Sequence, residues 1–188
     1  MKRYRVKGVR IYENTLIRGF EHIVFGENII IDSFVHIYAK KKITIGNYVS
    51  IGNFVFLSGG EEISIGDFSG LAQGSKIFAS TDDFKNWGFG NPTIDEKYRN
   101  PTRKPVRIER FCVIGANSVT LPGVTIGEGA TVGACSVVTR DLEPWGIYIG
   151  NRRIGERDRD GVLRNYEKFL SEQETQKREG RAFGLFRR

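Results

Sequence analysis

The chain has 188 residues, of which 39% are hydrophobic, and its 29 basic and 22 acidic residues give a net charge of +7. This composition excludes an intrinsically disordered chain and favours one globular domain, and the basic residues are not interleaved with aromatic ones as nucleic-acid binding would require. Neither a signal peptide nor a run of eighteen apolar residues is present, so we expect a cytoplasmic protein with no transmembrane segment.

Residues 1–24 mix polar and apolar side chains without a clear period, and we interpret them as an N-terminal cap. From residue 25 onwards, apolar residues recur every six positions and each triplet returns after twenty. The positions in phase are Phe25, Ile31, Ile37, Ile45, Ile51, Leu57, Ile65, Leu71 and Ile77, then Ile108, Ile114, Thr120, Ile126, Val132 and Val138. An α-helix cannot keep a six-residue period on one face, and a simple strand would show a period of two. The pattern therefore predicts an all-β fold, a parallel β-helix of about five coils over residues 25–143.

The repeat is interrupted between residues 78 and 107. This segment contains Asp82, Asp83, Trp87 and Tyr98. Because long loops are uncommon in compact domains and tend to be functional, we expect an extruded loop that carries part of a site.

Residues 144–188 form the predicted C-terminal extension. Apolar residues at Val162, Leu163, Tyr166, Phe169 and Leu170 indicate an amphipathic helix from about Arg157 to Arg178. The basic segment from Gly180 to Arg188 is expected to be a disordered tail.

The two cysteines, Cys112 and Cys135, lie in different predicted coils. We place both in small inward-facing positions of the repeat, as packed thiols rather than a disulfide or metal site.

The segment from Ile114 through Gly127 to Arg140 resembles the hexapeptide-repeat acyltransferases. The resemblance implies a left-handed β-helix, a homotrimer and acetyl-CoA as co-substrate, with no metal. The segments starting at Ile77, Asn91 and Tyr98 resemble sugar acetyltransferases of bacterial surface-polysaccharide clusters. Those enzymes include N-acetyltransferases that act on dTDP-linked 3-amino-3,6-dideoxyhexoses and relatives that acetylate the hydroxyl groups of galactosides and maltose.

The resemblance also implies the residues that would contact coenzyme A. Small residues match at Ala116 and Ala134, and a polar-basic pair matches at Thr139 and Arg140. The phosphates need fixed positive charge, for which Arg140, Arg152 and Arg153 are candidates. Alternatively, the alanines only satisfy the geometry of the coil and the arginines belong to a solvated tail.

The general base is the open question. O-acetyltransferase relatives place a histidine at the start of the long loop, where this chain has Asp82 and Asp83. A sugar hydroxyl benefits from a base poised near neutrality, whereas an amine needs mainly positioning, so the aspartates favour N-acetylation. As turn residues, Asp82 and Asp83 would instead cap the loop.

Further candidates would bind the sugar nucleotide. Phe84, Trp87 and Tyr98 offer rings for stacking on a base or sugar, or for packing on a neighbouring subunit. His36 would reach a groove or lie on the surface.

The sequence therefore predicts an acetyl-CoA-dependent acetyltransferase acting on the amino group of a nucleotide-linked sugar. O-acetylation of a saccharide is the nearest alternative. A non-catalytic scaffold and a zinc-dependent carbonic anhydrase-like β-helix are the other two, and the zinc site would need three histidines where the chain has two.

Overall fold

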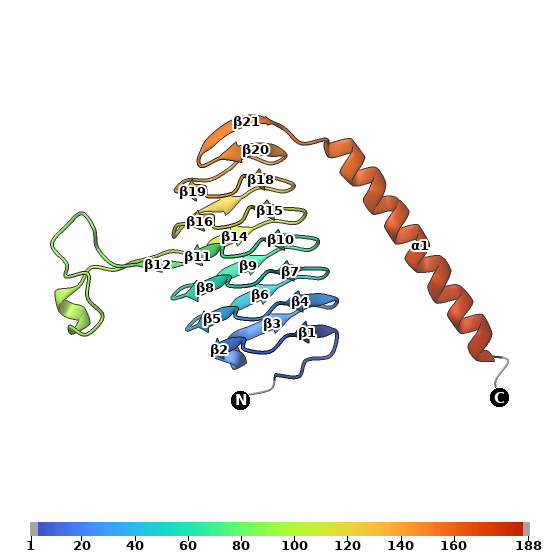
Figure 1. Cartoon of the computed structure of the whole chain (residues 1–188), viewed down its shortest axis with the longest axis horizontal. Coiled ribbons are helices and arrows are strands. Elements are labelled where there is room, and N and C mark those ends of the chain that lie inside the picture. The colour runs from blue at the N-terminus through green and yellow to red at the C-terminus, as the bar shows by residue number, and fades with distance from the viewer. Residues whose placement is uncertain (1–3, 186–188) are drawn as a thin grey trace. The chain divides into compact units, whose positions relative to one another are not determined.

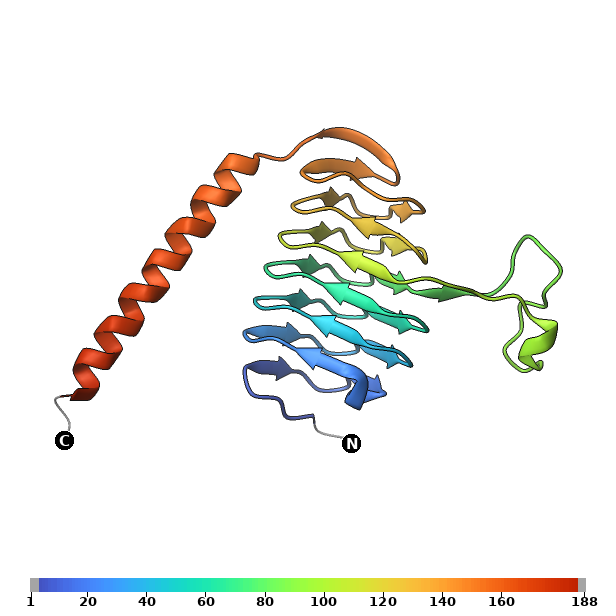
Figure 2. The ribbon, with the colours of Figure 1, turned by 180° about the vertical axis from the view of Figure 1, so that it is seen from behind.

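The computed structural model describes the backbone of residues 4–185 and the side chains of residues 4–176. It divides into two compact units, one up to Arg157 and one from Asp158 onwards. The first unit is a parallel β-helix with an extruded loop, and the second is a helix (Figures 1 and 2). The predicted fold class is therefore confirmed.

Each coil contributes short strands to three parallel sheets, here called A, B and C. Sheet A consists of β1 (Val9–Ile11), β4 (Ile29–Ile31), β7 (Ser50–Ile51), β10 (Gly70–Leu71), β15 (Val113–Ile114), β18 (Thr131–Val132), β20 (Gly146–Ile149) and the antiparallel β21 (Arg152–Glu156). Sheet B consists of β2 (Leu16–Arg18), β5 (His36–Ala39), β8 (Phe56–Gly59), β11 (Lys76–Phe78), β16 (Val119–Thr120) and β19 (Val137–Val138). Sheet C consists of β3 (Ile23–Phe25), β6 (Ile43–Ile45), β9 (Ile63–Ile65), β14 (Val106–Ile108) and β17 (Thr125–Ile126).

The apolar residues of the six-residue repeat fill the interior of the β-helix. Ile37, Leu57 and Ile77 lie in register in sheet B, and each is 0% exposed. Burying one such side chain contributes about 1.5–3 kcal/mol, and the same contact is repeated coil after coil. The period in the sequence is therefore the period of the core.

The corners of the coils hold bulky residues in the left-handed region. Phe34 and Phe54 have φ of 63° and 61°, and their rings stack at 5.2 Å between sheets A and B. Tyr48 and Phe68 do the same between sheets C and A, with centroids 4.7 Å apart. A left-handed conformation costs an L-residue about 1–2 kcal/mol, and we infer that ring stacking along each corner offsets part of this cost.

The number of coils differs from the prediction, because the β-helix has about seven coils rather than five. Within the predicted cap, β1 and β2 pair in parallel with β4 and β5. Ile11 and Ile17 stand opposite Ile31 and Ile37, twenty residues earlier in the chain. The cap is thus largely another coil in the same phase, and at the other end β20 pairs in parallel with β18.

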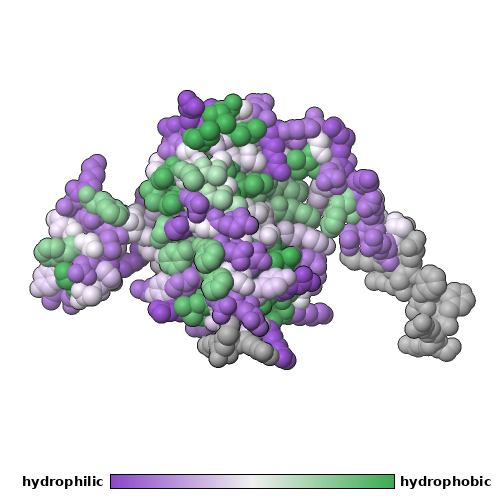
Figure 3. Space-filling view, viewed as in Figure 1, coloured by the Kyte–Doolittle hydropathy of each residue, from purple (hydrophilic) through white to green (hydrophobic). Residues whose placement is uncertain are grey.

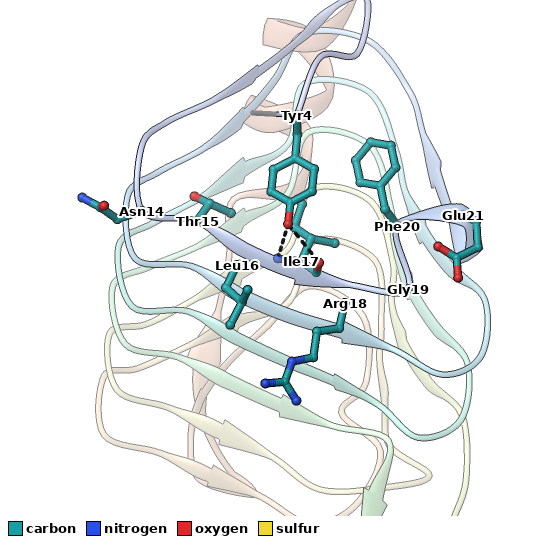
Figure 4. A pocket seen from close by; sticks show the side chains of 9 residues that line it. All are labelled: Tyr4, Asn14, Thr15, Leu16, Ile17, Arg18, Gly19, Phe20 and Glu21. Atoms are coloured by element: carbon teal, nitrogen blue, oxygen red, sulfur yellow. Dashed lines mark hydrogen bonds between the residues drawn. The ribbon is translucent and has the colours of Figure 1, made fainter. Parts of the chain in front are cut away.

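In the first coil, β2 is the outer strand of sheet B. The hydroxyl of Tyr4 donates to the carbonyl of Ile17 at 2.9 Å and accepts from its N–H at 3.0 Å (Figure 4). One phenol thereby satisfies two backbone groups of an exposed edge, which would otherwise invite pairing with another chain. A cavity of about 530 Å³ lies beside this edge and includes none of the predicted site residues.

The second unit is α1 (Arg159–Leu185), which extends beyond the end predicted near Arg178 and into the segment expected to be disordered. Residues 186–188 of the predicted basic tail lie outside the described residues. Within the part of the chain that is described, no helix has the length and apolar character needed to cross a membrane.

The two cysteines differ in environment, and both are free thiols. Cys112 is buried as predicted, and burial raises the pKa of its thiol to about 12. Cys135 is exposed at a corner with φ of 57°, so its predicted inward position was wrong. The next residue, Ser136, takes the buried place.

Candidate active site

The extruded loop, here called the arm, leaves the corner between sheets B and C after β11 and returns before β14 (Figure 1). Its base is an antiparallel pair, β12 (Ser80–Thr81) with β13 (Thr102–Arg103), and it contains one short 3₁₀ helix, η2 (Glu96–Tyr98). A second 3₁₀ helix, η1 (Phe20–His22), lies in the first coil. Strand pairing at the base fixes where the arm starts and ends on the β-helix.

Asp83 organises the first turn of the arm. Its Oδ1 accepts the N–H groups of Lys85 at 2.9 Å and Asn86 at 2.8 Å, and its Oδ2 accepts from Gly88 and Asn100, both at 3.1 Å. These bonds, those from Lys85 and Asn86 first, hold the pKa of Asp83 well below its usual range. The carboxylate is thus ionised and fully engaged in structural bonds, as the turn-residue interpretation expects.

Replacing Asp83 by alanine should therefore loosen the arm without unfolding the β-helix. We expect trypsin cleavage at Lys85 to accelerate by about 10-fold, because the backbone donors lose their acceptor, while the unfolding midpoint changes little. Mass spectrometry of a digestion time course measures this effect. The Asp83→Asn variant, which keeps one acceptor oxygen, should cleave at an intermediate rate, and equal rates in all three proteins would contradict the assignment.

The same hydrogen bonds give the arm a pH dependence. Because the pKa of Asp83 is lower in the folded arm than the ordinary value of 3.8, its stabilisation is complete above that ordinary value. This stabilisation is lost as the pH falls through the lower pKa that Asp83 has in the folded arm.

Asp82, by contrast, points to an open cavity at the base of the arm. Its Oδ1 accepts from Nη2 of Arg99 at 2.6 Å, and the two side chains are 31% and 15% exposed. The Nε of Arg99 is buried and has no hydrogen-bond partner among the described residues. The pair is therefore sheltered enough to keep one geometry.

The cavity has a volume of about 460 Å³, and its walls come from sheet B and the arm. Three cationic and two anionic residues line it: Lys40, Arg99, Arg103, Asp82 and Glu96. Glu96 lies 2.6 Å from Arg103, and this hydrogen bond and charge lower the pKa of Glu96. Both carboxylates are thus matched by arginines, and Lys40 adds a positive charge without a salt bridge to a described residue.

The three aromatic candidates differ in their position relative to the cavity. All three rings are exposed, Phe84 by 90%, Trp87 by 67% and Tyr98 by 51%, and of the three only Phe84 lines the cavity. Figure 3 shows apolar side chains on the arm. Their predicted role in binding a substrate stays a prediction.

His36 lies on the outer face of β5, next to the cavity but not in its wall. Its ring packs on Phe56 with centroids 5.0 Å apart. Burial, and then the charge of Arg18, lower the pKa of His36 and so favour its neutral imidazole form. The neighbouring Tyr38 lines the cavity instead.

The predicted coenzyme contacts lie on the last coils. Ala116 and Ala134 occupy the corner between sheets A and B, where the carbonyl of Ala116 accepts the N–H of Cys135 at 2.8 Å. At the other end of β19, Thr139 follows the strand at the corner where the arm also begins.

The register of the strands in sheet B shows where Thr139 lies relative to the cavity. Ile77, Thr120 and Val138 are partners in sheet B, so Thr139 lies in the same column as Phe78, two coils further on. At the usual spacing of parallel strands this is about 10 Å along the β-helix. Thr139 and the cavity therefore lie along the same corner of the β-helix.

Sequence reasoning missed Tyr38, Lys40, Arg99 and Glu96, all of which line the cavity. Only Lys40 had a signal, because it precedes Lys41 and Lys42, the two residues by which the twenty-residue spacing of the triplets exceeds three steps of six, at the corner where the arm later emerges. Glu96 and Arg99 reach the cavity through the path of the arm, which has no period, and Tyr38 lies on the outer face of β5.

Comparison with known proteins places the chain in a family. The family model described as bacterial transferase hexapeptide (six repeats) matches residues 105–140. The solved structure of a single-residue variant of AntD, an N-acyltransferase from Bacillus cereus, is 36% identical and aligns with a TM-score of 0.82 over 88% of this chain and 89% of that chain. This chain belongs to the hexapeptide-repeat acyltransferases.

Two complexes of AntD indicate what this acyltransferase relative binds. The variant structure contains dTDP-4-amino-4,6-dideoxyglucose and coenzyme A. Another, 34% identical with a TM-score of 0.85 over 89% of both chains, contains dTDP and 3-hydroxybutyryl-CoA. The sugar of AntD carries its amino group at C4, whereas the sequence resemblance was to enzymes of 3-amino sugars.

Curated relatives match over shorter segments. The dTDP-4-amino-4,6-dideoxy-D-glucose acyltransferase of Escherichia coli is 34% identical over 39% of this chain and 38% of its own length. The bifunctional protein GlmU of Thermotoga petrophila is 41% identical over 37% of this chain and 16% of its own length. The chain thus spans well under two thirds of these relatives.

Proposed function

We propose that this protein transfers an acyl group, most simply acetyl, from acyl-CoA to the amino group of a dTDP-linked amino-dideoxy sugar. The observation that carries the proposal is the likeness to AntD over nearly the whole of both chains, together with the ligands of AntD. The sheltered carboxylate in a cavity of suitable size supports it.

In this proposal Asp82 holds the sugar amine and Asp83 has a structural role. Arg99 bonds Oδ1 of Asp82, and Oδ2 accepts no hydrogen bond from a described residue. The amine lone pair attacks the thioester carbonyl, the C–N bond forms and the C–S bond breaks. The amine gives up one proton, and the departing thiolate takes up one. An amine needs mainly positioning for this step, which a carboxylate fixed by Arg99 supplies.

The proposed coenzyme contacts are those of the last coils. Ala116 and Ala134 would permit close approach of the pantetheine arm, and Thr139, Arg140 and Arg152 would hold its nucleotide end. Arg153 contributes less in this account, because it forms an ion pair with Glu156 at 3.1 Å.

We further propose that the protein works as a homotrimer in the cytoplasm, where acyl-CoA and nucleotide sugars are made, and that its product enters surface polysaccharide. Phe34 and Phe54 are 52% and 63% exposed, which favours burial against another subunit. Figure 3 shows apolar side chains distributed over the β-helix surface. A monomer in sedimentation at micromolar concentration would contradict the trimer.

The test of the function is the structure of the product. The protein is incubated with acetyl-CoA and with dTDP-linked 4-amino and 3-amino sugars, and the products are identified by mass spectrometry and NMR. We expect an amide at the sugar nitrogen. An ester at a sugar hydroxyl would support the O-acetyltransferase alternative, and the absence of any product together with no binding of CoA would support the scaffold alternative.

A further inference from the structure

The turn between β20 and β21 is fastened to the last coil by side chains. Gly150, with φ of 58°, donates its N–H to Oγ of Ser136 at 2.9 Å. Asn151 accepts the N–H of Thr139 through Oδ1 at 2.9 Å and donates through Nδ2 to Oγ1 of Thr139 at 2.6 Å. Two bonds from one amide thus hold residue 139 and residue 151 in a fixed relation.

The fixed turn places the Arg140 side chain beside the residue that precedes Arg152. Nη2 of Arg140 donates to the carbonyl of Asn151 at 3.4 Å, and Arg152 follows directly in the chain as the first residue of β21. Both side chains are exposed, and within the described residues neither lies in salt-bridge distance of a carboxylate. By contrast, Glu156 offsets the charge of Arg153.

Two positive charges carried by one turn favour the binding of an anion. Phosphate is the anion whose geometry suits two arginines, since each guanidinium offers several donors in one plane. The arrangement lies two coils from the arm cavity, along the same corner of the β-helix.

We propose that Asn151 is a positioning residue that sets Arg140 and Arg152 as one receptor for the phosphates at the nucleotide end of acyl-CoA. The proposal rests on the proposed function, because it takes acyl-CoA as the co-substrate. Asn151 acts through Thr139 and the turn, and does not itself meet the reacting atoms.

The test compares a thioester that has phosphates with one that lacks them. In the Asn151→Ala variant we expect the KM for acetyl-CoA to rise about 10-fold, with kcat changed by less than about 2-fold. The KM for S-acetylpantetheine, which lacks phosphate, should stay at the wild-type value. The matched control is Asn165→Ala, which removes an exposed amide from α1.

A binding measurement without sugar separates the two proposals. Calorimetry with coenzyme A alone should show about 10-fold weaker binding for Asn151→Ala, and a weaker dependence of binding on salt, than for the wild type. Wild-type protein that binds coenzyme A but acylates no amino sugar would overturn the proposed function and leave this test intact. Equal losses with both thioesters, or no loss with either, would overturn the role of Asn151, as would a wild type that binds no coenzyme A.

Discussion

Asp82→Asn should lower kcat with the amino sugar by about 10²-fold, because the uncharged amide no longer holds the amine in position. The substitution also weakens the ion pair with Arg99, which fixes the side chain at 2.6 Å. Steady-state rates of thiol release at saturating acetyl-CoA measure the effect.

Asp95→Asn is the matched control for this prediction. Asp95 lies in the same arm outside the cavity wall, and its Oδ1 accepts the N–H of Lys97 at 3.0 Å, a bond that asparagine can also accept. We expect its activity to stay within about 2-fold of wild type, as for surface changes in general. Similar activity for the two variants would show that Asp82 does not act on the amine.

Leu57→Ala should cost about 2–5 kcal/mol of unfolding free energy, because it leaves a cavity in a fully buried column. Leu57 stands between Ile37 and Ile77, and its loss removes contacts with the coils on both sides. Urea titration followed by circular dichroism gives the free energy of unfolding.

Ser64→Ala is the control for the core, since Ser64 lies on the outer, half-exposed face of β9. It should change the free energy of unfolding by less than about 0.5 kcal/mol. If Leu57→Ala were equally mild, the interior of the β-helix would be less tightly packed than the burial indicates.

The fold was predictable because the core and the sequence share one period. Positions such as Ile51 and Leu57 face inward in every coil, and each coil repeats the same geometry. The first coil was not detected because the charged residues at the start of the chain obscure the six-residue period, although Ile11 and Ile17 are in phase with it. The last coil was not detected because β20 pairs with β18 in sheet A at a sequence spacing that is not a multiple of six.

The candidate site was harder to predict because its parts do not repeat. The sequence indicated Asp82 and Asp83 together, and only the hydrogen bonds of the arm distinguish a structural carboxylate from one in the cavity. Arg99 lies seventeen residues from Asp82 and reaches it through the fold of the arm. The role of Asn151 likewise could not be predicted, because only the turn brings it to Thr139.

The most direct test of the account is a comparison of two sugars in one thiol-release assay. The substrates are dTDP-4-amino-4,6-dideoxyglucose and its counterpart with a hydroxyl at C4, each with acetyl-CoA, for wild type and Asp82→Asn. We expect coenzyme A release with the amino sugar only, and its loss in the variant. Release with the hydroxyl sugar, or an amino-sugar rate that is unchanged in Asp82→Asn, would contradict an N-acyltransferase with its amine site at Asp82.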